Sequence, residues 1–173
     1  MIEKPVKGEY PEFYHTYVSK VPDGKSVIDF LKTQMEELVN LFSGIEDGEA
    51  EKAYAEGKWT IKELLCHIID AERIFAYRAL SFARQDKTTL PGFEEDDYAK
   101  YSNANERELT NLVEEFYHVR KSNIALFSSF NAETSKITGN ANGKSISVRA
   151  IIYSIAGHAE HHKQVLKERY LKK

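Results

Sequence analysis

The amino-acid sequence predicts an all-α protein, a four-helix bundle with long connecting loops. Four long segments carry apolar residues at steps of three and four, which is the spacing of one buried helix face. The connections between them hold the proline, glycine and asparagine residues that interrupt helices. The composition, 42% hydrophobic and 29% charged, is that of a globular protein. A folded bundle is therefore expected, and a disordered chain is not.

The first two helices carry clear start signals. The first is expected from about Ser26 to Ser43, with Ser26 as its N-cap. The second begins in the stretch WTIKELL, where Thr60 and Glu63 have the spacing of a capping box. Its apolar stripe continues to about Gln85, which places a long helix in the middle of the bundle.

The third and fourth helices are predicted in the second half of the chain. The third is expected to begin around Asn105, because Glu108 follows three residues later in a second capping-box pattern. The fourth is expected to begin near Ser145 or Ser147 and to run to about Tyr170. Four helices of this length predict a bundle whose long connections exclude the simplest up-and-down design.

The segments outside these helices also carry signals. Residues 86–104 form a long acidic loop, and loops of this length are typical of lids or binding segments. Asn142 and Gly143 predict the turn of a short hairpin. The aromatic residues of 1–25 predict a short helix or strap across the bundle. We expect residues 1–173 to form a single domain of this kind.

Charge and hydropathy exclude several classes of function. Lys and Arg number 24 against 27 Asp and Glu, so the formal charge is −3, and no basic stripe is available to neutralise phosphates. No apolar run reaches the ~20 residues that span a bilayer, and the N-terminus lacks an apolar signal segment. The single cysteine, Cys66, excludes an internal disulfide. We therefore expect a cytoplasmic protein that binds neither nucleic acid nor membrane.

Three of the six histidines lie in the stretch IAGHAEHHKQV, residues 155–165. On a helical wheel His162 lies about 20° from Ile155 in the apolar stripe, His158 about 60° away and His161 about 120° away. Two imidazoles four residues apart on the buried side can hold one cation, whereas His161 is expected at the rim. A core-facing histidine is more often an ordinary hydrogen-bonded residue, and that alternative remains open for the pair.

A third imidazole comes from the second helix. His67 lies about 100° from Ile68, at the margin of the apolar stripe, which suits a site that opens into a groove. The adjacent Cys66 is expected to point away from the core and to be a small helical filler, so a Cys–His ligand pair is not expected. Glu160 is expected to face solvent or the flank of the fourth helix, and no zinc-protease motif is present.

Polar residues near the predicted core have two interpretations. Glu72 lies within about 40° of the core direction of its helix, and so do Arg120 and Asn123 on the third helix. A Glu72–Arg120 salt bridge between two helices and a supporting role that orients a ligand imidazole are equally compatible with this pattern. Tyr153 and Arg78 are candidates for the wall of the cleft.

Three stretches together resemble the DinB/YfiT-like superfamily, particularly its DinB_2 branch. They read KWTIKELLCHIIDAERIFAYRALSFAR, LPGF and VRAIIYSIAGHAEHHKQVL. The resemblance implies an up-down-down-up bundle, often a homodimer, that binds a divalent metal through three histidines. Carried over to this chain, the implied ligands are His67, His158 and His162.

The resemblance also implies a range of functions. Three neutral imidazoles and an open position are the catalytic arrangement for Zn²⁺, and Ni²⁺ also suits imidazole ligands. The first hypothesis is a transferase that uses a low-molecular-weight thiol to attack a small electrophilic substrate. The alternatives are a non-catalytic metal-binding stress or interaction protein and a metal-dependent hydrolase. For hydrolysis, Glu72 is the carboxylate nominated as general base.

Overall fold

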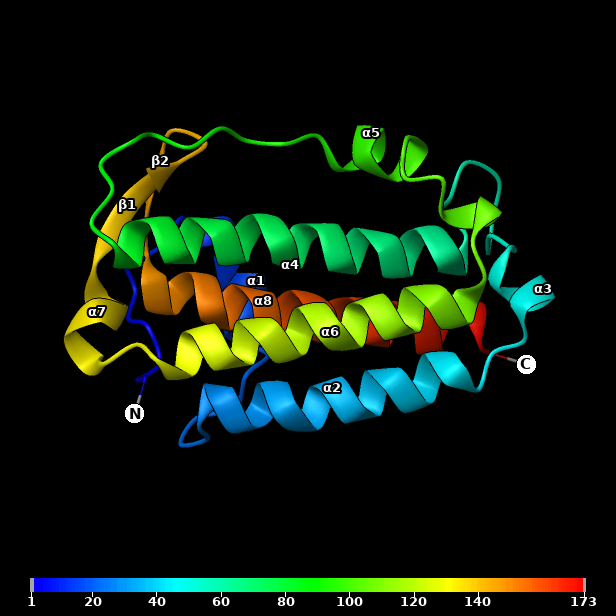
Figure 1. The fold of residues 1–173 in the computed structure, drawn as a ribbon, viewed down its shortest axis with the longest axis horizontal. Coiled ribbons are helices and arrows are strands. Elements are labelled where there is room, and N and C mark those ends of the chain that lie inside the picture. Colours follow the sequence, from blue (N-terminus) through cyan, green and yellow to red (C-terminus); the bar gives the residue numbers. More distant parts are fainter. Residues whose placement is uncertain (1, 173) are drawn as a thin grey trace.

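Four long helices lie side by side in the computed structural model, which describes residues 2–172. They are α2 (Val27–Ser43), α4 (Ile61–Ala83), α6 (Leu109–Ser128) and α8 (Val148–Val165). In Figure 1, α4 and α6 both run opposite to α2 and α8, which is an up-down-down-up order. Two consecutive helices can run the same way because the connection from α4 to α6 returns along the whole bundle. The predicted fold class is confirmed.

The local signals at three helix starts are confirmed. The Ser26 hydroxyl accepts a hydrogen bond from the Asp29 amide at 3.3 Å and caps α2. At α4, the Glu63 amide donates to the Thr60 hydroxyl at 3.1 Å, and the Thr60 amide donates to the Glu63 carboxylate at 2.7 Å. Ser147 caps α8 in the same way as Ser26 caps α2. These caps satisfy amides that have no partner within the helix.

The predicted start of the third helix is wrong. Asn105 lies in the short 3-10 helix η2 (Ala104–Glu106), and α6 begins at Leu109. The Leu109 amide donates to the Asp47 carboxylate at 2.6 Å, so the cap comes from a residue 62 positions earlier. Asp47 begins the short helix α3 (Asp47–Ala50) in the connection between α2 and α4. No local pattern can reveal a cap that the fold supplies from another segment.

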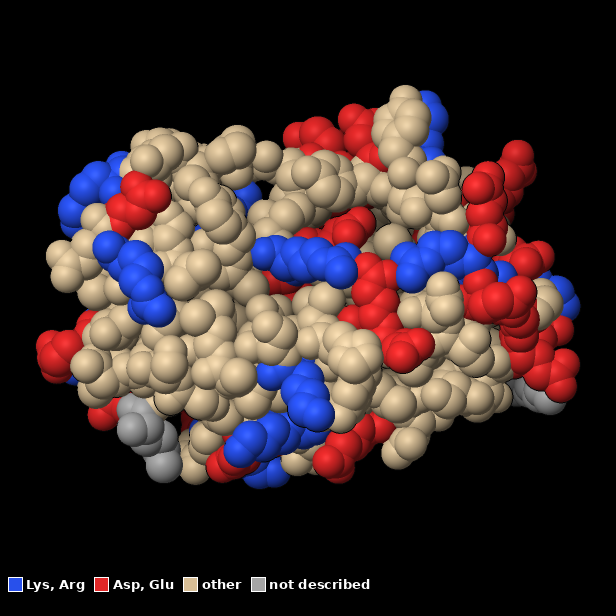
Figure 2. All heavy atoms as spheres, in the orientation of Figure 1, with Lys and Arg blue, Asp and Glu red and all other residues tan. Residues whose placement is uncertain are grey.

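The long acidic connection contains more structure than predicted. Within 86–104 the helix α5 (Glu95–Lys100) lies over α4 in Figure 1. Figure 2 shows that acidic side chains gather at α5 and at the end of the molecule that carries α3. Elsewhere on this face, acidic and basic side chains are mixed. In the described part of the chain, no helix has both the length and the apolarity needed to cross a membrane.

The predicted hairpin is present beside α8. Strand β1 (Thr138–Ala141) pairs antiparallel with β2 (Lys144–Ser147). The turn residues have φ values of 52° at Asn142 and 69° at Gly143, as a type I′ turn requires. Two further short elements complete the fold: α7 (Ala132–Lys136) before the hairpin, and a π-helical turn, η3 (Leu166–Tyr170), after α8.

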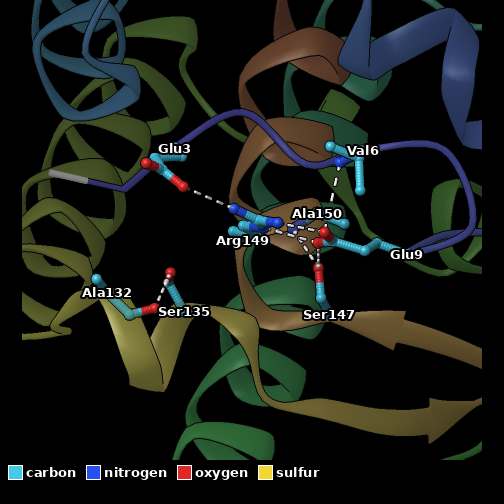
Figure 3. A network of polar contacts seen from close by, with 8 residues as sticks. All are labelled: Glu3, Val6, Glu9, Ala132, Ser135, Ser147, Arg149 and Ala150. Atoms are coloured by element: carbon cyan, nitrogen blue, oxygen red, sulfur yellow. Dashed lines mark hydrogen bonds and ion pairs between the residues drawn. The ribbon is translucent and has the colours of Figure 1, made fainter.

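The N-terminal segment crosses α8 as a strap that contains η1 (Glu12–Tyr14) and α1 (His15–Val18). Figure 3 shows how the residues that precede η1 are attached to the start of α8. The Glu9 carboxylate accepts hydrogen bonds from Arg149 Nε at 2.7 Å and from the Ser147 hydroxyl at 2.8 Å. The Ser147 amide also donates to the Glu9 carbonyl at 2.9 Å. The N-terminal segment is therefore attached to the start of α8 by an ion pair and by a backbone hydrogen bond.

The buried apolar residues form two clusters along the bundle. The first contains Ile155 and Ala156 of α8 together with Phe75 of α4. The second contains Ala159 of α8 and Ile68 of α4. The boundary between the clusters on α8 falls at residues 157 and 158, so a polar group there interrupts neither cluster. His158 lies at this boundary, whereas His67 and His162 lie between members of the second cluster.

Candidate metal centre

The three histidines implied by the resemblance converge between α4 and α8. The Nε2 atoms of His67 and His158 are 2.9 Å apart, and those of His158 and His162 are 3.0 Å apart. One ligand atom from each of the three residues lies within 4.8 Å of the other two. His158 and His162 come from successive turns of α8, and the close packing of α4 on α8 brings His67 to them.

Hydrogen bonding alone does not account for this arrangement. A neutral imidazole nitrogen either carries a proton and donates it or has one lone pair and accepts. The Nε2 atom of His158 faces two other Nε2 atoms, so it can make one good hydrogen bond and leaves one contact unsatisfied. Three lone pairs that converge on a cation remove the conflict. The donor set therefore fits a divalent metal such as Zn²⁺ or Ni²⁺.

Burial keeps these imidazoles in the neutral form that binds metals. It lowers the pKa of His67 to about 4 and that of His162 to about 3. Burial, and after it the charge of neighbouring His162, holds the pKa of His158 well below its ordinary value of 6.5. At neutral pH all three rings are uncharged, so the metal does not have to displace protons to bind them.

The degree of burial differs from the sequence prediction at all three rings. His158, expected at the edge of the stripe, is 6% exposed, whereas His162 is half-buried. The reason is the strap, since the Tyr17 ring packs edge-on against His158 with centroids 5.4 Å apart. His67, expected at a margin, is 3% exposed and packs against Trp59 at 4.7 Å. His161 lies outside the cluster and half-buried at the rim, as predicted.

Glu72 and Arg120 form a buried salt bridge. Arg120 Nε lies 2.8 and 2.9 Å from the two Glu72 carboxylate oxygens, and Asn123 donates to the same carboxylate at 3.2 Å. Arg120 also donates to Gln34 at 2.9 Å, and Gln34 in turn donates to the Ala156 carbonyl at 2.9 Å. The four helices are joined by this network. Of the two interpretations of Glu72, the structure favours the inter-helix salt bridge.

Support of the imidazoles by other side chains is limited. Among residues 2–172, the Nδ1 atoms of His67 and His162 are buried and have no hydrogen-bond partner. A metal-binding histidine commonly donates this second ring N–H to an acceptor. The orientation of these two rings is therefore fixed by packing, for example of Trp59 against His67.

A pocket of about 290 Å³ adjoins the histidines. His67 and His158 both line it, and so do Ala71, Phe75 and Arg78 along one face of α4. Arg78 thus lies in the cleft wall, where the sequence placed it. Further lining comes from parts of the chain that carried no periodic signal: Tyr14 and Tyr17 of the strap, Gly92 of the long connection, and Asn142 and Lys144 of the hairpin.

Two expectations about neighbouring residues are wrong. Tyr153 is 2% exposed, belongs to the first apolar cluster and is not part of the pocket wall. Cys66 does not point away from the core but is 6% exposed in the second cluster. The segment with α5 and η2 packs on α4 and buries the face that a bare helical wheel exposes. Burial raises the pKa of the Cys66 thiol to about 11.

Glu160 lies on the flank of α8. Its carboxylate accepts a hydrogen bond from Gln34 at 3.1 Å and pairs with Lys163 at 2.8 Å. These contacts direct it away from the pocket, whose lining does not include it. The absence of a zinc-protease glutamate, inferred from the sequence, is consistent with this position.

Fold and site together define a four-helix bundle with a buried cluster of three histidines beside an aromatic pocket. A sequence model of the DinB superfamily, DinB_2, matches residues 30–166. The chain belongs to the DinB superfamily. The resemblance seen in the sequence is confirmed.

Two individual proteins are similar to this chain. A protein of Oceanobacillus iheyensis, described as a proposed metal-dependent hydrolase, is 26% identical over 135 residues, which cover 76% of each chain. YfiT from Bacillus subtilis, described as a proposed metal-dependent hydrolase with an unusual four-helix bundle topology, superposes with a TM-score of 0.66. That match covers 96% of this chain and 93% of YfiT at 12% identity, so it bears on the fold alone.

Proposed function

We propose that this protein is a divalent-metal-dependent enzyme that acts on a small molecule bound in the pocket. His67, His158 and His162 are the proposed metal ligands. The observation that carries the proposal is the convergence of three uncharged Nε2 atoms beside a pocket that His67 and His158 line. When bound there, a zinc or nickel ion would lower the pKa of a coordinated water or thiol and so supply a nucleophile at neutral pH.

The side chains of the pocket bind and enclose the substrate. Phe75, Tyr14 and Tyr17 give it an aromatic wall, and the Tyr14 and Phe75 rings meet edge-on at 6.1 Å. Such a wall favours an apolar or aromatic body and excludes bulk water from the histidine end.

The first candidate reaction is transfer of a low-molecular-weight thiol to an electrophilic carbon. The thiol proton leaves to solvent, the sulfur forms a C–S bond, and the leaving group departs with the electrons of its broken bond. This reaction requires no general base in the transfer step. The contacts of Glu72 favour thiol transfer, because Arg120 binds both Glu72 carboxylate oxygens and Glu72 does not line the pocket.

The second candidate reaction is hydrolysis, which the description of the Oceanobacillus iheyensis protein favours. Attack by water needs a base that accepts a proton. Glu95 of α5 lines the pocket and is better placed for this role than Glu72. Loss of hydrolysis in Glu95→Gln, with metal binding intact, would assign Glu95 that role. Unchanged hydrolysis would remove Glu95 from the mechanism.

The proposal is tested first by calorimetric titration of Zn²⁺ and Ni²⁺ into untagged, metal-free protein. The wild type and the control His161→Ala should bind one ion per chain, and His67→Ala should lose most of this affinity. Equal binding by His67→Ala would refute the proposed ligands. The loaded protein is then assayed with glutathione and 1-chloro-2,4-dinitrobenzene, and with nitrophenyl esters. Metal binding without turnover across such panels would favour the non-catalytic metal-binding alternative.

A further inference from the structure

The wall of the pocket has a cationic end far from the histidines. His67 and Arg78 lie on one face of α4, eleven residues apart, which is about 16 Å along the helix axis. Ala71 and Phe75 lie between them on the same face. The pocket therefore extends along α4, with the histidine cluster at one end and a guanidinium group toward the other.

Arg78 is buried without a carboxylate partner. It is 5% exposed, and no salt bridge joins it to an acidic side chain anywhere in residues 2–172. Its Nη2 donates to the Pro91 carbonyl at 2.7 Å, and its guanidinium carbon lies 5.5 Å from the centre of the Phe75 ring. The other two buried arginines of the described chain each pair with a glutamate, Arg120 with Glu72 and Arg149 with Glu9.

A second cation lies in the same wall, and the acidic residue of the lining comes from a different segment. Lys144 of the hairpin lines the pocket, and no salt bridge to it is found among the described residues. Glu95, the acidic residue of the lining, belongs to α5. In Figure 1, α5 lies over the N-terminal half of α4, which carries His67, whereas the hairpin lies beside the C-terminal end of α4. An anion in the pocket is thus drawn toward Arg78 and away from α5.

We propose that the pocket recognises a carboxylate group of its ligand through Arg78, assisted by Lys144. The ligand is then an elongated small molecule whose apolar body lies along Phe75. The planar guanidinium matches a carboxylate through paired N–H donors, and a buried cation without a protein counter-ion gains most from such a ligand. Reaction of the opposite end of the ligand at the histidines is a step that rests on the proposed function. Recognition of the carboxylate does not.

The test compares two probes of the same shape, 4-phenylbutyrate and its uncharged amide, 4-phenylbutanamide. Both are titrated into metal-free protein and followed by ligand-observed NMR, so that a metal cannot supply the anion site. The wild type should bind the carboxylate at least about tenfold more tightly than the amide. Arg78→Gln, which keeps a donor for the Pro91 carbonyl, should abolish this preference. Lys144→Gln should reduce it.

The matched control is Arg73→Gln, on the same helix but paired on the surface with Glu115 at a contact outside the pocket. It should retain the full preference. Circular dichroism establishes that each variant is folded, and Arg78→Met serves if Arg78→Gln is not. Equal binding of acid and amide by the wild type would overturn the inference. So would a preference that survives loss of the Arg78 charge, or one that requires added Zn²⁺.

Metal binding and carboxylate preference are measured separately, so failure of the proposed function can be told apart from failure of this inference. His162→Ala, which removes a proposed ligand that does not line the pocket, should lose the metal yet keep the preference for 4-phenylbutyrate. Arg78→Gln should bind Zn²⁺ as the wild type does. A protein that binds no metal but prefers the carboxylate would refute the metal-dependent enzyme and support recognition by Arg78. A protein that binds metal without this preference would do the reverse.

Discussion

Gly157 of α8 lies directly against the backbone of Tyr17 in the strap. A Cβ atom at position 157 would overlap the Tyr17 carbonyl group, so only glycine permits this approach. Glycine inside a helix is unfavourable relative to alanine, and here a packing reason outweighs that cost. The next residue is His158, whose ring is covered by the Tyr17 side chain. The same contact thus places the strap and encloses the candidate metal centre.

Replacing this glycine should displace the strap. Gly157→Ala is expected to lower the free energy of unfolding by about 1–3 kcal/mol, because the added methyl group has no space. Urea denaturation measures the change. The control is Gly48→Ala in α3, where an added Cβ meets no atom within 4 Å, and a neutral or slightly stabilising effect is expected. Wild-type stability of Gly157→Ala would contradict the contact.

The Glu72–Arg120 pair should behave as a coupled unit. Arg120→Met leaves the buried Glu72 carboxylate without its cation, and a loss of about 3–5 kcal/mol in unfolding free energy is expected. The double variant Glu72→Gln/Arg120→Met removes both charges and should recover part of that loss. Chemical denaturation of the two single variants and the double variant provides the comparison. Additive losses would show that the two residues do not interact.

The attachment of the strap should depend on pH. Hydrogen bonding to Arg149 is the main cause that lowers the pKa of Glu9 from its ordinary value of 4.5. Because the folded-state pKa lies below the unfolded-state value, the Glu9 carboxylate stabilises the fold above pH 4.5. This contribution is lost as the pH falls through the folded-state pKa.

Glu9→Gln should therefore be less stable than the wild type at pH 7, and the difference should shrink on acidification toward pH 3. Thermal unfolding at a series of pH values measures it. Glu12→Gln removes the same charge from the same segment outside the Glu9–Arg149 network and should leave the pH profile unchanged. A constant stability difference between wild type and Glu9→Gln across this range would contradict the assignment.

The parts of the fold that depend on local sequence were predictable. Capping by Ser26 and the Thr60–Glu63 pair uses atoms within three residues, and the apolar stripes need only helical periodicity. The hairpin turn at Asn142 and Gly143 follows from the φ values that these residues tolerate. The direction of the four helices came from the family resemblance and not from periodicity.

The parts that depend on distant contacts were not predictable. The residue that caps α6 at Leu109 is Asp47, which lies in a different segment. Cys66 is buried by the long connection, and a helical wheel carries no information on where a connection runs. The histidines could be selected because two lie on one face of a helix, His67 lies at the margin of another apolar stripe, and the resemblance implies the same three ligands. The pocket could not, because its wall combines the strap, α4, the long connection, the hairpin and α8, and no local pattern shows that the fold brings these five segments together. The expected homodimer stays a prediction that sedimentation analysis can test.

Metal binding should stabilise the folded protein. If the unfolded chain does not hold the ion, Zn²⁺ at 100 times its dissociation constant should add about 2.7 kcal/mol to the free energy of unfolding. Thermal melting with and without Zn²⁺ measures this for the wild type and for His158→Ala. A variant that gains as much stability as the wild type would place the ion elsewhere.

The most direct measurement is the metal content of protein purified without a metal-binding tag, determined by elemental mass spectrometry. The account predicts about one zinc or nickel ion per chain in the wild type and in His161→Ala, and almost none in His67→Ala. A wild type without metal after exposure to both ions, or a His67→Ala variant that carries as much metal as the wild type, would contradict it.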